Sequence, residues 1–85
     1  MNAKRHMSLV AAMPCAICGE SPVQVHHIRE EQGMSQRASD FLTVPLCYEH
    51  HQGATGIHGM GRKAFERLHR RSELDLLATT ISQLA

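Results

Sequence analysis

The sequence has few of the large aromatic side chains on which a small hydrophobic core usually depends. Its 85 residues include no Trp, one Tyr and two Phe. A chain of this length forms one domain, and it buries too little surface for its core alone to be more than marginally stabilising. We therefore expect a bound metal ion, a partner molecule or both to contribute to the stability of the fold.

The sequence also lacks a long apolar segment, and its number of cysteines is odd. No run approaches the length of a membrane span. The apolar stretch over residues 7–13 ends at Pro14 and Cys15, which argues against a secretory signal peptide. Three cysteines cannot all pair as disulfides, and together with seven histidines they favour metal binding in a reducing compartment. We expect a cytoplasmic protein with no membrane partner.

Strong charge of either sign is absent too, since the formal net charge is +1. This value neither requires nor excludes a nucleic-acid partner. The distribution is more informative, because five basic residues fall in one ten-residue segment: Arg62, Lys63, Arg67, Arg70 and Arg71. Such a segment is either a solvated helix face or a face that binds nucleic-acid phosphates.

The order of apolar and polar residues predicts short strands and helices. Residues 1–14 read as a short N-terminal helix or arm ended by Pro14. Two strands are predicted at 23–28 and 41–44, the second stopped by Pro45. The segment 29–40 has no sustained period and reads as a loop, so the two strands are expected to form a hairpin.

Helices are predicted after the hairpin. A short helix is expected from Leu46, because Gly53, Gly56 and Gly59 disfavour a single helix that continues to His58. Residues 62–71 place Ala64, Phe65 and Leu68 on one helical face, and Ser72 is a good N-cap for a final amphipathic helix. That helix has apolar residues at helical spacing, which predicts packing on the rest of the domain or a dimer seam: Leu74, Leu77, Ala78, Ile81 and Leu84.

Two pairs of residues have the spacing of metal ligands. Cys15 and Cys18 flank a tight turn followed by Gly19, and Cys47 and His50 have the same separation. The predicted hairpin lies between the pairs, and its two ends are expected to be close. Three thiolates and one imidazole favour Zn²⁺ in a closed structural site, which would supply folding free energy. Unrelated free cysteines are the alternative, while a thioredoxin-like use lacks the surrounding βαβ pattern.

Four further histidines fall near the ends of the predicted hairpin: His26, His27, His51 and His58. One continuous helix would separate the imidazoles of His51 and His58 by ~10 Å, too far for one ion. A break at the glycines would let His58 approach. Because adjacent strand residues point to opposite faces, His26 and His27 share a site only where the strand twists or ends.

These residues resemble the HNH nucleases of the ββα-metal class, in the variant that carries a zinc knuckle. The motifs behind the resemblance are Cys15-x2-Cys18, Val25-His26-His27-Ile28 and Pro45-Leu46-Cys47-x2-His50-His51. More narrowly, residues 15–84, with His51-Gln52-Gly53, Thr55-Gly56 and Phe65-Glu66, resemble the phage-encoded, RecA-dependent recombination-enhancement (Ref-like) nucleases. The resemblance implies an α+β domain with a zinc-stapled ββα-metal core over residues 15–60, on which helices from residues 61–85 pack.

The resemblance also implies an activity. It is that of a metal-dependent endonuclease that hydrolyses DNA phosphodiester bonds, encoded by a phage or prophage, active in the bacterial cytoplasm and linked to DNA recombination. No element that would read bases is visible in the sequence, so we expect recognition of the DNA backbone with little sequence specificity. His27 would act as general base on the attacking water. A catalytic divalent cation, Mg²⁺, Mn²⁺ or Zn²⁺, would be held by His26, His51 and His58. The implied partners are DNA and a recombinase filament, although only Lys4, Arg5 and His6 represent a basic N-terminal arm.

One position departs from the family pattern. The middle Asn of the HNH motif falls on Leu42 here, and Asp40 is the nearest polar residue. Asp40 would ligate the metal, orient His27 or only cap a turn.

Two other classes of function compete with the nuclease. A zinc-stabilised DNA-binding module without catalysis would use the same Cys₃His site and the basic segment, but it leaves His27, His51 and His58 unexplained. A protein-interaction module that displays the final helix explains neither group of ligands.

Overall fold

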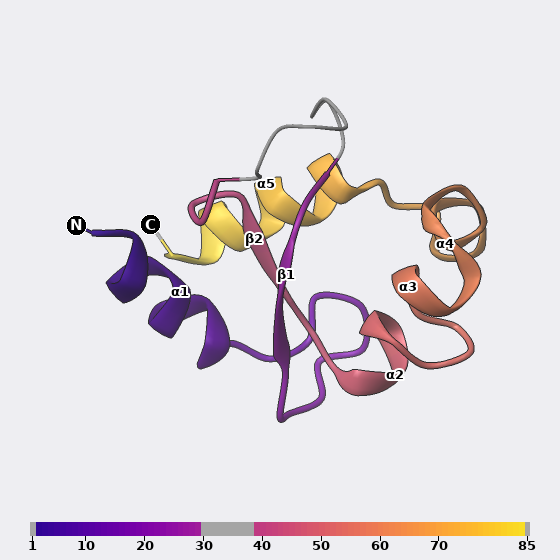
Figure 1. The fold of residues 1–85 in the computed structure, drawn as a ribbon, viewed down its shortest axis with the longest axis horizontal. Coiled ribbons are helices and arrows are strands. Elements are labelled where there is room, and N and C mark those ends of the chain that lie inside the picture. The colour runs from indigo at the N-terminus through magenta and orange to yellow at the C-terminus, as the bar shows by residue number, and fades with distance from the viewer. Residues whose placement is uncertain (1, 30–38, 85) are drawn as a thin grey trace.

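A two-stranded antiparallel sheet crosses the middle of the computed structural model (Figure 1). The structure describes residues 2–29 and 39–84, so most of the predicted loop at 29–40 lies outside the described residues. β1 (Gln24–His27) pairs with β2 (Thr43–Leu46), and His26 lies opposite Val44. The predicted hairpin and the α+β class are confirmed.

Five helices surround this sheet in the described part of the chain. They are α1 (Ala3–Ala11), α2 (Tyr48–His51), α3 (Ile57–Met60), α4 (Arg62–His69) and α5 (Glu73–Leu84). In Figure 1, α1 lies on one side of the strand pair, α2, α3 and α4 lie on the other, and α5 runs behind it. None of the described helices has the length and apolar character that crossing a membrane would require.

The hydrophobic core is small and lies between the sheet and the helices. Its largest fully buried apolar side chains are Phe65, Ile28, Leu46, Leu76 and Val44. Cys15 belongs to the same buried cluster, and Cys47 packs against it. The core therefore extends directly to the predicted metal ligands. This is expected for a chain whose hydrophobic core is too small to stabilise the fold by itself.

The second strand begins later than predicted. Pro45 does not stop this strand but lies inside it, opposite Val25. A proline is tolerated there because both strands of a two-stranded sheet are edge strands, so the missing N–H need not break a ladder. Its carbonyl oxygen accepts a hydrogen bond from Ala16 N at 2.9 Å, which joins β2 to the turn that carries Cys15.

The apolar face predicted for the C-terminal helix is only partly correct. Leu77 is buried, but Leu74 and Ile81 are 43% and 50% exposed. The buried face of α5 follows the spacing i, i+3, i+4 and i+7 from its first residue, in the order Glu73, Leu76, Leu77 and Thr80. The prediction failed because this buried face begins with a charged residue and ends with a polar one.

Ser72 caps the N-terminus of α5, as predicted. Asp75 N donates to Ser72 Oγ at 3.1 Å, and Ser72 N donates to Asp75 Oδ2 at 2.9 Å. This reciprocal pair satisfies backbone donors at the start of the helix. In α4, Phe65 is buried as expected, whereas Leu68 is 52% exposed.

Candidate metal centres

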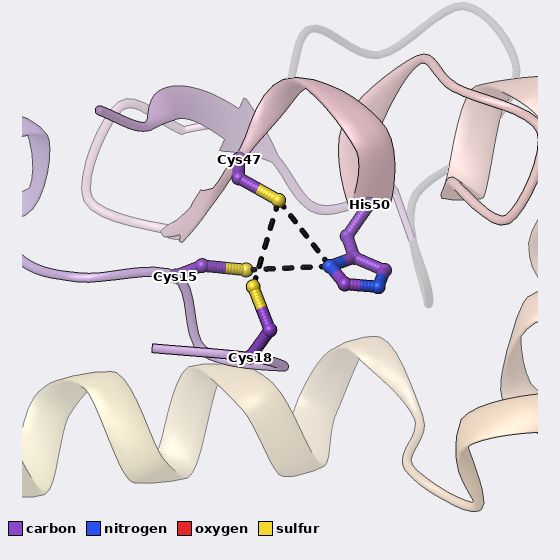
Figure 2. A group of neighbouring side chains, drawn as sticks. All are labelled: Cys15, Cys18, Cys47 and His50. Atoms are coloured by element: carbon purple, nitrogen blue, oxygen red, sulfur yellow. Dashed lines mark hydrogen bonds between the residues drawn. The ribbon is translucent and has the colours of Figure 1, made fainter. Parts of the chain in front are cut away.

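Three cysteines and one histidine converge at one end of the sheet (Figure 2). Cys15 and Cys18 come from the turn before β1, Cys47 directly precedes α2, and His50 lies within α2. The four potential ligand atoms all lie within 4.8 Å of one another. The structure thus brings together all four residues that the sequence predicted for a structural zinc site.

The distances within this Cys₃His cluster fit a tetrahedral ion. The sulfurs of Cys18 and Cys47 are 3.7 Å apart. His50 Nδ1 lies 3.3 Å from Cys47 Sγ and 3.8 Å from Cys15 Sγ. A Zn–S bond of ~2.3 Å in tetrahedral geometry separates two sulfurs by about 3.8 Å. The spacing and the donor types therefore suit a metal ion such as zinc.

The two cysteines of the first pair differ in acidity. Burial acts to raise the pKa of the Cys15 thiol, but hydrogen bonds to its sulfur outweigh burial and lower the pKa from 9.0 to about 6. One of the donors is the backbone N–H of Ile17, at 3.4 Å. Burial and the neighbouring thiols raise the pKa of Cys18 to about 11. Metal binding would therefore release a proton from Cys18, because thiolates are the ligands.

Arg71 supports the turn that carries the first cysteine pair. It donates Nη1–H to the carbonyl oxygen of Ala16 at 3.0 Å and Nη2–H to Thr79 Oγ1 at 2.7 Å. Sequence reasoning assigned Arg71 to a nucleic-acid surface, but its guanidinium is directed toward the protein and joins the Cys₃His cluster to α5. The other four basic residues of that segment are exposed: Arg62, Lys63, Arg67 and Arg70.

A second cluster contains only histidines. His26 comes from β1, His51 from α2 and His58 from α3, and one nitrogen of each lies within 4.8 Å of the others. The ring centroids are 4.7 Å apart for His51 and His58 and 5.1 Å apart for His26 and His51. A tetrahedral zinc with Zn–N bonds of ~2.0 Å places its nitrogens about 3.3 Å apart, which is compatible with the upper limit of 4.8 Å in this cluster.

Glycines allow α3 to fold back onto α2, as the sequence suggested. A Cβ on Gly56 would lie 2.6 Å from the Glu49 carbonyl oxygen, and a Cβ on Gly59 would collide with the Gly53 carbonyl oxygen. Close backbone approach, rather than positive φ, is what requires glycine at these two positions. The turn is also tied by Glu49 Oε2, which accepts hydrogen bonds from Thr55 N at 2.9 Å and Thr55 Oγ1 at 2.7 Å.

Two of the three histidines form a hydrogen bond through one ring nitrogen to a neighbouring side chain. His26 donates Nε2–H to Glu73 Oε2 at 2.6 Å, and His51 donates Nδ1–H to Gln24 Oε1 at 2.6 Å. A neutral imidazole that donates from one nitrogen accepts at the other. His26 Nδ1 and His51 Nε2 are therefore the nitrogens left to bind a metal.

The electrostatics of the cluster favour the neutral forms of His51 and His58. Burial, followed by the nearby charges of His26 and His58, lowers the pKa of His51 from 6.5 to about 4. Partial burial, followed by the nearby His26, also lowers the pKa of His58, and the opposing effect of Glu73 is smaller. Neutral imidazole is the form that binds metal ions. One side of the cluster remains open to solvent at His58, which leaves room for water or a substrate oxygen.

His27 does not belong to this cluster among the described residues. It points to the opposite face of β1 from the buried His26, as strand alternation requires. Its Nε2–H donates to Asp40 Oδ1 at 2.8 Å, and both side chains are about one-third exposed, at 38% and 33%. Of the three roles considered for Asp40, this contact matches orientation of His27.

A cavity of about 320 Å³ opens beside the histidine cluster. Its lining includes His26, His58 and Glu73, together with the cationic side chains of Arg29 and Arg62. Sequence reasoning did not single out Gln24, Arg29 or Glu73 as residues of a functional site. The contacts of Glu73 with β1 span more than forty residues, so no local pattern indicates them.

Comparison with known proteins gives a family without an assigned activity. The family model described as "Protein of unknown function (DUF968)" matches residues 1–84. A similar curated protein is "Uncharacterized protein YdfU" of Escherichia coli (strain K12), which is 34% identical over 50 residues. That match covers 56% of this chain and 14% of the relative, so the chain corresponds to a small part of the longer protein.

Proposed function

From the geometry of its site, we propose that this chain, which belongs to the DUF968 family of unknown function, is a metal-dependent endonuclease of the HNH type. Its substrate is DNA, which it cleaves by phosphodiester hydrolysis with little sequence specificity. The resemblance to phage recombination-enhancement nucleases extends the proposal to DNA recombination or processing. The Cys₃His cluster is then the structural zinc site of the ββα-metal core.

The observation that carries the proposal is the cluster of His26, His51 and His58 beside a cavity lined by Arg29 and Arg62. Three imidazoles with an open side are the donor set of a hydrolytic rather than a closed structural metal site. A divalent cation at such a site stabilises the charge that develops on a phosphoryl group and on its leaving oxygen. The two guanidinium groups suit phosphate oxygens.

Each of the remaining residues has a defined task in this proposal. The resemblance gives His27 the task of taking the proton of the attacking water, although its ring points to the opposite face of β1 from the proposed ligand His26. Asp40 orients the His27 ring through the hydrogen bond to Nε2. Arg67 and Arg70, which line a groove of about 540 Å³ together with the acidic Glu66 and Asp75, bind phosphates farther along the DNA backbone.

The competing proposal is a zinc-stabilised DNA-binding module without catalysis. It has the support of the exposed basic side chains on α4. It gives no reason for three histidines to converge, nor for the low pKa of His51, which keeps that ring ready to bind a metal. Both proposals need the Cys₃His zinc, so metal content alone does not separate them.

A plasmid-nicking assay separates them. The full chain carrying one zinc per molecule is assayed with Mg²⁺, Mn²⁺ and Zn²⁺ added in turn, beside a His51→Ala variant. We expect nicking by the wild type with at least one ion and its loss in the variant, whereas zinc at the Cys₃His cluster and DNA binding by gel shift are retained. A wild type that binds DNA but cleaves none with all three ions favours the non-catalytic module.

A further inference from the structure

Glu73 is a buried acidic residue far in sequence from every candidate ligand. It is the first residue of α5, and only 2% of its side chain is exposed. Both of its carboxyl oxygens are used. Oε2 accepts the His26 Nε2–H at 2.6 Å, and Oε1 accepts the backbone N–H of Arg29 at 3.1 Å. A carboxyl group is costly to bury, and these two contacts lower that cost.

The two contacts fix both the position and the tautomer of the His26 ring. The bond to Arg29 N anchors the carboxyl group beside the end of β1, since a backbone N–H is always a donor. The bond to Nε2 keeps the ring proton on that nitrogen. Nδ1 of His26 is then the lone-pair nitrogen, on a ring whose neighbours are His51 and His58.

We propose that Glu73 is a positioning residue of the histidine metal site, which presents Nδ1 of His26 to a divalent cation. The inference rests on the proposed function only for the presence of an ion at that site. Carboxylate partners of this kind raise the basicity of a ligating imidazole and fix its orientation, and removing them typically weakens metal binding. The first turn of α5 thereby becomes part of the metal centre although it supplies no ligand.

Substitution by glutamine makes a specific test because it keeps the shape of the side chain. In Glu73→Gln, the amide oxygen has to face the Arg29 N–H, since that group can only donate. The amide NH₂ then faces His26 Nε2, which must become an acceptor. The ring proton moves to Nδ1, the nitrogen that would bind the ion. The matched control is Glu66→Gln on α4, an exposed residue with the same change of charge.

The measurement has two parts, both on the full chain with zinc in the Cys₃His cluster. Long-range ¹H–¹⁵N correlation spectra at about pH 8, where unperturbed histidines are neutral, report the His26 tautomer. We expect Nε2–H in the wild type and in Glu66→Gln, and Nδ1–H in Glu73→Gln. Titration with Co²⁺, followed by visible absorption, should show affinity about 10–100-fold weaker for Glu73→Gln than for the two reference proteins.

The outcomes separate the two proposals. If the wild type binds no Co²⁺ beyond the Cys₃His cluster, the proposed metal site itself is wrong. If the wild type binds Co²⁺ and Glu73→Gln binds it equally well, or keeps the Nε2–H tautomer, the positioning role is wrong and the metal site stands. Retention of zinc by Glu73→Gln and an unchanged thermal transition show that a weaker affinity does not come from unfolding.

Discussion

His50 and His51 are consecutive residues of α2, but their imidazoles lie in different ligand clusters. His50 completes the Cys₃His cluster, while His51 joins His26 and His58. Successive side chains on a helix diverge by ~100°, so a single turn can serve two sites. Cys47 is the N-cap of this short helix, and His50 lies within it. The arrangement of these two ligands in the Cys₃His cluster therefore fixes the position of His51 as well.

The first prediction concerns the Cys₃His cluster. We expect Cys47→Ser to lose about one zinc per chain and with it the cooperative thermal transition, because the core of a chain this short is marginal without its metal. Elemental analysis and circular dichroism melting measure both. Tyr48→Ala, at a neighbouring side chain that is 64% exposed, is the control and should keep zinc and transition. A Cys47→Ser protein with unchanged zinc and melting temperature would contradict this assignment.

The second prediction concerns His27 and Asp40. His27→Ala should reduce nicking by about 10²–10⁴-fold, the usual contribution of a general base, without loss of metal. Added imidazole should restore part of the activity of His27→Ala, since the ring is about one-third exposed. Asp40→Asn should give a smaller loss that imidazole does not repair. Full activity of His27→Ala would assign the base to another group.

The third prediction concerns pH. The pKa of His51 is lowered to about 4 from 6.5, so the folded protein keeps this ring neutral where the unfolded chain protonates it. The resulting stability is fully present above about pH 6.5 and is lost as the pH falls toward 4. Over this range the folding equilibrium constant changes by at most about tenfold for each pH unit. Denaturant unfolding should show that the free energy of unfolding of the wild type, relative to that of His51→Asn, falls as the pH is lowered through this range. A difference independent of pH would refute the shift.

The fourth prediction concerns the close packing of α3 against the loop that follows α2. By helix propensity alone, Gly59→Ala in α3 should stabilise the protein by roughly 0.5–1 kcal/mol. The collision with the Gly53 carbonyl oxygen predicts the opposite sign, a destabilisation of about 1–3 kcal/mol. Co²⁺ affinity at the histidine cluster should fall as well, because His58 precedes Gly59. Thermal melting decides between the two signs.

The fifth prediction separates two arginines of the same basic segment. Arg71→Ala should lower the free energy of unfolding by about 2 kcal/mol, because it removes two hydrogen bonds from a charged group. Arg67→Ala, at an exposed position, should change stability by less than about 0.5 kcal/mol. It should weaken DNA binding and reduce the salt dependence by about one unit of slope. The reverse pattern would return Arg71 to the DNA-binding surface.

Both ligand clusters could be predicted because their signals are local. The Cys-x2-Cys and Cys-x2-His spacings and the glycines after His51 all act within a few residues. The alternation of His26 and His27 across the strand was equally local, and it correctly left open that one of them faces elsewhere. The capping pair of Ser72 and Asp75 belongs to the same category.

What could not be predicted depends on tertiary contacts. The bonds of Glu73 to His26 and Arg29 cross 47 and 44 positions of the chain. Because Glu73 is buried, the inward face of α5 is turned away from Leu74 and Ile81, which the apolar pattern placed inside. Pro45 was misread for a similar reason, since only the two-stranded topology shows that its strand is an edge.

The segment from Arg71 to Glu73 has a consequence for how this domain can be divided or transplanted. The candidate ligands among the described residues all lie before residue 59, so a fragment ending at residue 70 would contain both clusters. It would lack the guanidinium that secures the first cysteine turn and the carboxyl group that secures His26. A count of ligands would therefore overstate what the fragment retains, and α5 has to accompany the ligands into any shortened or grafted version of the site.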